Sequence, residues 1–391
     1  MFEFYKIKKA SLFGISLIVC LFCIQCNVNK IGKNKIFFVP GKKWLDTRGV
    51  HINAHGGGVW FNKGIYYWYG EHKTSGSAGN TSLFGVTCYS SKDLNHWKNE
   101  GIVLKVQENA NSEITKGCVI ERPKVVYNKK TGKYVMWFHL ELKNQGYDAA
   151  RTGVAVSDSP QGPFDFIKSY RPNVGIWPMN FEEKFKLPSV DENELKSWTP
   201  EWLTAVKNGT FIQRDFNKGQ MARDITVFVD TDGKAYHIHS SEDNLSLDIS
   251  ELTADYLDFT NNWNVVAPAG HNEAPAIFKK NDIYYMITSG CTGWDPNEAR
   301  SFSSKSIWGP WKSLGNPCIG KDASLTFHSQ GTYVLPVEGK KDQFIFMADR
   351  WNPNNPIEGT YVWLPIQFDG QKPIVKWFDK WNLKSIDDNY K

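Results

Sequence analysis

The sequence predicts an all-β protein, a five-bladed β-propeller with one helical insertion around residues 168–221. Three observations support this prediction. An aromatic-rich hairpin recurs five times, a turn followed by an aromatic residue comes after several of these hairpins, and one longer stretch interrupts the repeat with a helical pattern. Radial repetition of small sheets is the architecture that such repeats favour.

The five hairpins define the repeat. Their second arms read KGIYYWYG from Lys63, GKYVMWF from Gly132, GKAYHIHS from Gly233, NDIYYMITSG from Asn281 and KDQFIFMADR from Lys341. Their first arms lie just upstream, as GGVWF, PKVVYN, ITVFVD, APAIFK and TYVLPV. Alternating apolar positions on both sides of a short polar loop are typical of β-hairpins, so five equivalent units are expected.

The remaining strands of each unit follow the hairpins. The segments SSKDLNHW from Ser90, SDSPQGPF from Ser157 and SSKSIWGPW from Ser303 each supply a turn and an aromatic residue, which completes a four-stranded blade. The insertion contains DENELKSWTPEWLTAVKNG, in which the spacing of Leu and Trp predicts one or two helices on a rim. A β-sandwich is the alternative, but sandwiches do not ordinarily repeat one hairpin signature five times.

Aromatic residues are the outlier of the composition. They make up 14% of the 391 residues and include 16 Trp, whereas charged residues stand at an ordinary 22%. Aromatic rings stack on the apolar faces of sugars, and they also fill the cores of β-sheets, so both interpretations stay open. The net charge of +5 is spread along the chain, which argues against nucleic acid as a partner.

The N-terminus predicts export. Three lysines precede an apolar stretch at residues 10–24, which is too short for a membrane span and suits a secretory signal. We expect residues 1–26 to be a signal peptide and residues 27–391 to form the propeller domain. Cys26 could carry the lipid of a bacterial lipoprotein, although Gln25 is a poor residue before that cleavage. The expected protein is a monomer, periplasmic or anchored to the outer membrane of a bacterium through that lipid alone.

Four further cysteines show no close metal-type spacing. In an exported protein they could form disulfides or remain buried thiols, and the sequence leaves both open. They are Cys88, Cys118, Cys291 and Cys318.

Polar residues precede every first arm. The first strand of each propeller blade lines the central axis, so side chains at the start of these strands converge on one funnel. The motifs are NAHGGG at Asn53, ERP at Glu121, RD at Arg223, HNEAP at His271 and FHSQG at Phe327.

Three of these motifs contain a carboxylate, at Glu121, Asp224 and Glu273. A buried carboxylate is costly unless it has a partner, and Glu121 could pair with Arg122, or Asp224 with Arg223, for purely structural reasons. Three carboxylates at equivalent places in a ring favour a functional site. Glycoside hydrolysis uses such a set, with one acid for the leaving oxygen and a second group for the water or the sugar.

These motifs resemble glycoside hydrolase family 43, over about residues 36–383. The general acid of that family lies in a Glu-Gly-Pro-like motif, which EAP at Glu273 matches. The carboxylate that orients the acid and tunes its pKa is matched by Asp224 in RDITVFVDTDGKAY. The family's His-Asp-Pro motif, which supplies the general base, has no counterpart, because the chain reads AHGGG from Ala54.

The chain resembles one branch of the family more closely, the exo-β-1,3-galactanases. That branch has AHGGG, WYGE and ERPK motifs and a Gln at the start of blade five. Here WYGE ends at Glu71, ERPK starts at Glu121 and SQGT contains Gln330. The resemblance implies that Glu273 is the general acid and that Gln330, as an imidic tautomer, positions the attacking water. It also implies that Glu121 and Asp224 grip the sugar or set the pKa of the acid. Because a neutral amide is a feeble base, Glu121 is its rival for the water.

Weaker matches imply further contacts with the sugar. Glu71 and Arg122 could bind the galactose hydroxyls, Tyr147 could close the pocket, and Thr292 could border the site beside Trp294.

The resemblance also bears on metals. Members of the family often hold a central metal through a blade-five histidine, and His328, two residues before Gln330, could have that role, although a lone histidine is usually structural. No cofactor is expected to be required, although a structural Ca²⁺ could be bound.

The expected activity is the release of galactose, with inversion, from the non-reducing end of β-1,3-galactan, such as the backbone of arabinogalactan. Inversion requires about 6.5 to 9.5 Å between the acid and the group that activates water. The alternatives are an α-L-arabinofuranosidase, a β-galactosidase of another linkage, and a non-catalytic carbohydrate-binding propeller.

Overall fold

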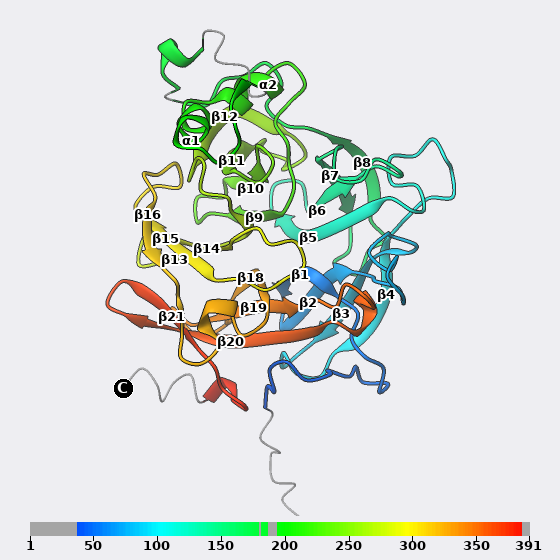
Figure 1. Ribbon diagram of the computed structural model, residues 1–391. Helices are drawn as coiled ribbons and strands as arrows, with labels where there is room; N and C mark the ends of the chain where they lie inside the picture. Colours follow the sequence, from blue (N-terminus) through cyan, green and yellow to red (C-terminus); the bar gives the residue numbers. More distant parts are fainter. Residues whose placement is uncertain (1–36, 180, 187–193, 385–391) are drawn as a thin grey trace, which may run out of the picture. The chain divides into compact units, whose positions relative to one another are not determined.

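Five β-sheets surround a common axis, and each sheet forms one blade of a β-propeller (Figure 1). The structure is a computed structural model that describes residues 37–179, 181–186 and 194–384. These residues belong to one compact unit, and the predicted signal peptide with Cys26 lies outside them. The five-bladed prediction is confirmed.

Blades one to four each contain four antiparallel strands in chain order. Blade one comprises β1 (His55–Asn62), β2 (Ile65–Glu71), β3 (Gly85–Ser91) and β4 (Lys98–Lys105). Blade two comprises β5 (Val119–Asn128), β6 (Lys133–Glu141), β7 (Arg151–Ser157) and β8 (Asp165–Tyr170). Blade three comprises β9 (Ile225–Val229), β10 (Ala235–Ser241), β11 (Ser246–Leu252) and β12 (Phe259–Val266). Blade four comprises β13 (Glu273–Lys280), β14 (Ile283–Ser289), β15 (Ala299–Ser304) and β16 (Lys312–Gly315).

Blade five has an additional short strand. Its order is β17-β21-β20-β19-β18, and β17 pairs with β21 in parallel. These strands are β17 (Cys318–Ile319), β18 (Gln330–Pro336), β19 (Phe344–Arg350), β20 (Thr360–Asp369) and β21 (Lys372–Lys376). Two single-turn 3₁₀ helices, η3 (Ala323–Leu325) and η4 (Pro356–Glu358), lie in its loops.

The ring closes through its innermost strands and through the chain ends. Each of β1, β5, β9, β13 and β18 contacts the innermost strands of both neighbouring blades. Close to the ends of the described chain, Phe38 pairs with Trp381, and their rings stack at a centroid distance of 4.2 Å. An aromatic pair of this kind adds about 0.5–1.5 kcal/mol beyond the area that it buries.

The predicted helices lie in the insertion, which begins after Tyr170 rather than at residue 168 because β8 extends to that residue. It contains η1 (Glu183–Phe185), α1 (Pro200–Lys207) and α2 (Thr210–Asp215). Thr199 caps α1 by accepting a hydrogen bond from Trp202 N, and Pro200 stands at the first helical position, where its missing N–H costs nothing. Figure 1 shows both α-helices beside blade three.

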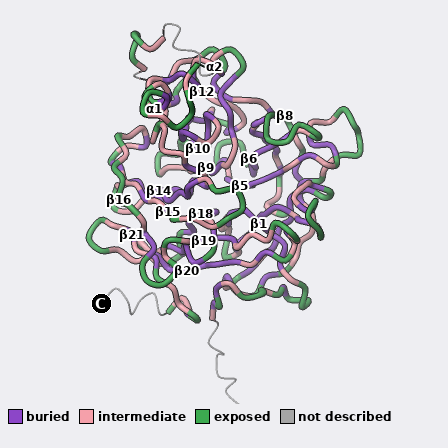
Figure 2. The backbone as a smooth tube through the Cα atoms, viewed as in Figure 1, coloured by how far each residue is buried: buried purple, intermediate pink, exposed green. Residues whose placement is uncertain are grey.

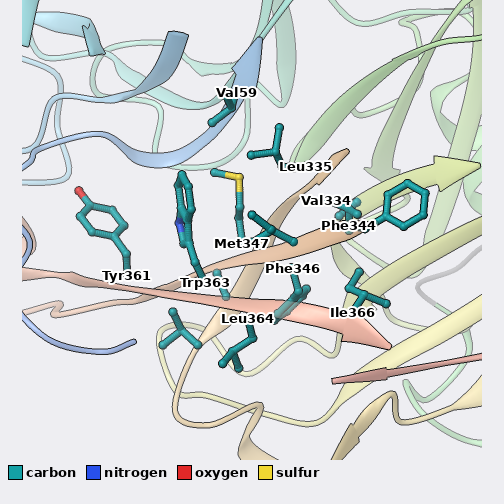
Figure 3. Close-up of a cluster of buried hydrophobic side chains, with 14 of the residues drawn as sticks. Val59, Val334, Leu335, Phe344, Phe346, Met347, Tyr361, Trp363, Leu364 and Ile366 are labelled. Carbon is teal, nitrogen blue, oxygen red and sulfur yellow. The ribbon is translucent and has the colours of Figure 1, made fainter. Parts of the chain in front are cut away.

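Much of the aromatic excess fills the core between blades. Figure 3 shows Trp363, Met347 and Phe346 within the largest cluster of buried side chains. The ring of Trp363 lies 4.8 Å from that of Trp68 in blade one, so the two blades share one apolar core. Along the backbone, buried residues follow the strands and exposed residues follow the loops (Figure 2). No helix among the described residues is long and apolar enough to cross a membrane.

Candidate active site

A β-bulge shapes the start of three innermost strands. The pairing register shifts directly after His55 in β1, Glu121 in β5 and Glu273 in β13. In each case the next residue has a left-handed backbone, with φ of 62° at Gly56, 54° at Arg122 and 53° at Ala274. A bulge bends a strand and re-aims the side chain beside it. Three of the five polar motifs that precede the first arms, NAHGGG, ERP and HNEAP, are therefore the sequences of these bulges.

Each bulge is capped by a carboxylate from the preceding blade. The N–H group of the left-handed residue would otherwise be a buried donor without a partner. The three pairs are Gly56 N to Asp349 Oδ2 at 2.6 Å, Arg122 N to Glu71 Oε1 at 2.9 Å, and Ala274 N to Asp224 Oδ2 at 3.0 Å. Acidic side chains thus link blade five to one, one to two, and three to four.

The bulges surround a cavity of about 320 Å³. Its lining includes every predicted catalytic residue and all but one of the predicted sugar-binding residues. The lining residues are Glu71, Lys73, Glu121, Arg122, His139, Tyr147, Arg223, Asp224, Asn244, Glu273, Gly293, Trp294, Gln330 and Trp351. Ligand pockets span about 300–1,000 Å³, so this cavity suits a small ligand such as one or two sugar rings.

Glu273 is held as a protonatable acid. Burial and, to a smaller extent, the neighbouring Asp224 carboxylate raise the pKa of Glu273 to about 7, although the positive charge of Arg122 opposes the shift. Its Oε1 accepts a hydrogen bond from Asn244 Nδ2 at 2.8 Å, and its Oε2 lies 3.4 Å from Gln330 Nε2. A carboxyl with this pKa can keep its proton near neutral pH and donate it.

Glu121 is held as an anion. Burial alone would raise the pKa of Glu121, but the hydrogen bond and positive charge of His139 outweigh it and hold the pKa well below its ordinary value. His139 Nδ1 lies 3.1 Å from Glu121 Oε2, and Oε1 accepts from Asn80 Nδ2 at 3.0 Å and from Tyr147 Oη at 2.7 Å. Glu121 therefore stays ionised across the working range of an enzyme.

The positive charge that stabilises ionised Glu121 comes from His139. It lies between two carboxylates, with Nε2 2.8 Å from Glu141 Oε1. Burial disfavours its charged form, but hydrogen bonds with Glu121 and Glu141 raise the pKa of His139 to about 9. The imidazolium donates from both ring nitrogens.

The amide of Gln330 is fixed on both sides. Its Oε1 accepts from Arg122 Nη2 at 2.5 Å and from Trp351 Nε1 at 2.9 Å, and its Nε2 donates to Ser289 Oγ at 2.9 Å. Arg122 also forms an ion pair of 2.9 Å with Asp224. The amide therefore has one orientation in the site.

The structure departs from several expectations. Glu121 pairs with His139 rather than with Arg122, and Asp224 pairs with Arg122 rather than with Arg223, whose nearest acid is Asp243 at 3.6 Å. Consecutive strand residues point to opposite faces, so sequence neighbours make poor ion-pair partners.

Thr292 differs from the expectation that it borders the site. Its hydroxyl donates to Asp295 O and accepts from Asn297 Nδ2, so it serves the loop, while Gly293 and Trp294 line the cavity. Glu71 lines the cavity as expected, but its Oε1 caps Arg122 and it forms a buried ion pair with Lys73.

The lining or supporting residues that were not predicted from the sequence include Lys73, Asn80, His139, Asn244, Gly293 and Trp351. The sequence could have indicated Lys73 and Trp351, because they lie within two residues of the ends of β2 and β19, at the mouth where the first arms begin. Asn80 and Asn244 come from loops that no periodic pattern marks.

Donor atoms of Glu121, His139 and Asp224 lie within 4.8 Å of one another and could hold a metal ion. The raised pKa of His139 works against that role, because a metal ion would have to displace the proton before the ring nitrogen could bind it. His328 stands apart from this group. Its side chain is half exposed, its nearest acid is Asp322 at 3.5 Å, and it belongs to no group of three such ligands among the described residues.

The four cysteines in the described part of the chain are free thiols, which settles the question that the sequence left open.

A pocket at the centre of a propeller, with one carboxyl that keeps its proton and another that stays ionised, defines a glycoside hydrolase. The family profile of glycosyl hydrolases family 43 matches residues 199–368. A solved family-43 β-1,3-galactosidase with galactodeoxynojirimycin is 55% identical, with a TM-score of 0.86, and the alignment covers 88% of this chain and 100% of that one. The chain therefore belongs to glycosyl hydrolases family 43.

Two more distant structures are also similar. The exo-β-1,3-galactanase of Clostridium thermocellum is 35% identical with a TM-score of 0.69, over 88% of this chain and 66% of that one. The exo-β-1,3-galactanase of Phanerochaete chrysosporium with β-1,3-galactotriose is 30% identical with a TM-score of 0.71, over 89% of this chain and 68% of that one. No match was found among curated protein sequences.

Proposed function

We propose that this enzyme is an exo-acting, inverting β-1,3-galactosidase that releases galactose from the non-reducing end of β-1,3-galactan. One observation carries the proposal, namely that Glu273 and Glu121 share one small pocket and have pKa values pushed in opposite directions. The similarity to a β-1,3-galactosidase and to two exo-β-1,3-galactanases supports galactose as the sugar and the β-1,3 linkage.

In this mechanism Glu273 donates its proton to the glycosidic oxygen as the bond to the anomeric carbon breaks. The electron pair of that bond leaves with the oxygen of the remaining chain. Water attacks the anomeric carbon from the opposite face, which inverts its configuration. The negative charge of Glu121 stabilises the positive charge that develops on the sugar ring.

Gln330 is the residue that we propose holds the water. Its distance of 3.4 Å from Glu273 is too short to place a sugar and a water between them. Inverting enzymes keep about 6.5 to 9.5 Å between the two groups. We infer that the galactose ring breaks this contact and that the Nε2 group then faces the water, while Arg122 and Trp351 keep hold of Oε1.

Two residues are candidates for the base that accepts the proton of the attacking water. Gln330 in its imidic form could take the proton, and Glu121 could take it as a carboxylate. The three hydrogen bonds that stabilise ionised Glu121 weaken it as a base, so we favour Gln330. Gln330→Ala and Glu121→Gln separate the two, because azide supplied as a nucleophile should restore turnover only in the variant that has lost the base. Restoration in Glu121→Gln alone would assign the base to Glu121.

Asp224 positions and tunes the acid, and two aromatic residues cover the sugar. Asp224 raises the pKa of Glu273 and anchors the peptide that follows it. Tyr147, which is partly exposed at the cavity, and Trp294 would close over the sugar.

We further propose that the protein is an exported monomer, on the basis of its N-terminal pattern, and that catalysis needs no metal. A structural Ca²⁺ at the group of Glu121, His139 and Asp224 would require His139 to lose its proton first.

The proposal is tested with purified protein on β-1,3-galactan, arabinan and aryl α-L-arabinofuranosides, with products separated by chromatography. Galactose as the sole early product from galactan is expected. Arabinose from arabinan would support the α-L-arabinofuranosidase alternative, and binding of galactan without any released sugar would support a non-catalytic propeller.

A further inference from the structure

Two peptide units at the mouth of the propeller share an unusual set of partners. Gly56 and Arg122 both have left-handed backbones, and carboxylates from neighbouring blades cap their N–H groups. Their carbonyl oxygens converge on one side chain, that of Lys124, whose Nζ donates to Gly56 O at 2.9 Å and to Arg122 O at 3.2 Å. Lys124 therefore joins the bulges of blades one and two.

Lys124 is a buried lysine outside the catalytic cavity. It lies on β5 with 2% of its surface exposed, and it is not among the residues that line the cavity. Burying an ammonium group is costly unless charges and hydrogen bonds compensate. Burial lowers the pKa of Lys124 to about 7, and the positive charge of Arg122 lowers it as well, while the carboxylates of Glu71, Asp224 and Asp349 act in the opposite direction.

A glycine in the facing strand makes room for the lysine. A Cβ atom on Gly58 would lie 2.8 Å from Lys124 Cδ, closer than such atoms approach each other in proteins, and 3.3 Å from the ring of Tyr333. The third glycine of AHGGG and the lysine of ERPK thus fit each other across two blades. This contact gives a physical reason why both motifs occur in one chain.

Arg122 connects this arrangement to the chemistry. Its guanidinium binds Asp224 at 2.9 Å, Gln330 Oε1 at 2.5 Å and Gly331 O at 3.1 Å. A left-handed backbone is strained for arginine, and it persists only when the surroundings hold both ends of the residue. Glu71 holds the N–H group and Lys124 holds the carbonyl group.

We propose that Lys124 is a positioning residue of the active site, which fixes the peptides of Gly56 and Arg122 so that the Arg122 guanidinium stays on Asp224 and Gln330. The inference rests on the proposed function, in which Gln330 holds the water. Lys124 acts through Arg122 and does not touch the sugar.

The test compares Lys124→Met and Gly58→Ala with the wild-type enzyme in galactose release from β-1,3-galactobiose, well below the unfolding temperature of each protein. The control is Lys133→Met, which removes an exposed lysine paired with Asp158 on blade two. We expect kcat to fall about 100-fold in both variants, because a misplacement of about 1 Å costs that much. The apparent KM should change little, and Lys133→Met should match the wild type.

A double variant shows whether Gly58→Ala acts through its contact with Lys124 or through a general disturbance of the fold. In Lys124→Ala the methyl group of Gly58→Ala no longer meets the lysine, and its closest remaining contact is the ring of Tyr333 at 3.3 Å, so most of the loss caused by Gly58→Ala should disappear in the double variant. Losses that multiply in the double variant would overturn the proposal, and so would a folded Lys124→Met enzyme with wild-type kcat. A wild-type enzyme that releases no galactose would refute the proposed function instead. In that case a crystal structure of Lys124→Met would test the positioning role without an activity assay. An unchanged contact of Arg122 with Asp224 and Gln330 would contradict that role.

Discussion

Asp224 binds the peptide that carries Glu273. Its Oδ2 accepts a hydrogen bond of 3.0 Å from Ala274 N, the residue directly after the acid, and also receives Arg122 Nη2 at 2.9 Å. One carboxylate therefore fixes the backbone of the acid, raises its pKa and connects it to the arginine that holds Gln330. This relationship makes the two sides of the proposed reaction interdependent.

Replacing Glu273 with Gln removes the proton donor without changing the shape of the site. Turnover of β-1,3-galactobiose should fall by about 10²–10⁴-fold, the range that general acids contribute. Hydrolysis of a 2,4-dinitrophenyl galactoside should fall far less, because that leaving group needs no proton. The control is Glu108→Gln, an exposed acid paired with Lys116. Equal losses on both substrates would show that Glu273 is not the acid.

Replacing Asp224 with Asn should move the pH profile. In the wild type, kcat/KM should fall as the pH rises past about 7, because Glu273 must hold its proton. Burial and the negative charge of Asp224 both raise that pKa, so removal of the charge should lower the pKa of Glu273 and shift the basic limb to lower pH. The measurement is kcat/KM from pH 4 to 9 for both enzymes. A basic limb that stays in place or moves to higher pH would contradict this coupling.

Replacing His139 with Gln leaves two buried carboxylates without their shared cation. Breaking a buried ion pair in this way costs about 3–5 kcal/mol, so urea unfolding should show a large loss of stability near pH 6. The folded pKa of about 9 lies above the unfolded value, so the stabilisation by His139 is complete below about pH 6.5.

The same stabilisation is lost as the pH rises through about 9. The difference in unfolding free energy between wild type and His139→Gln should therefore shrink over that range. A difference that stays constant from pH 6 to 9.5 would mean that His139 is neutral in the folded protein.

Removal of divalent metals should leave activity unchanged. Hydrogen bonds with Glu121 and Glu141 raise the pKa of His139 to about 9, so a metal ion in the group with Glu121 and Asp224 would have to displace the proton of His139. The measurement is galactose release after dialysis against EDTA, with the metal content of the protein determined in parallel. Loss of activity that Ca²⁺ restores would place a functional ion at the site.

Regular strand geometry explains why the sequence could predict the convergence of Glu121, Asp224, Glu273 and Gln330. Each lies at the start of a first arm, and in a closed ring these starts share one mouth, so the repeat alone brings them together. Local distortion explains what could not be predicted. The bulge after Glu121 sets which residue of β6 faces it, and that residue is His139.

Asn244 shows the same limit in a loop. It ends a run of three residues, Glu242, Asp243 and Asn244, that all have a left-handed backbone without being glycine. Asp and Asn are common in turns and in left-handed conformation, so the sequence is compatible with a turn here, but it does not indicate where the Asn244 side chain points. Only the structure could therefore show that its amide reaches Glu273.

The anomeric configuration of the first sugar released tests the mechanism most directly. Proton NMR during hydrolysis of β-1,3-galactotriose should show α-galactose first, because water attacks opposite the β-linked leaving group, and the β form should appear only later by mutarotation. β-Galactose as the first product would contradict inversion and would require a covalent intermediate on one of the carboxylates.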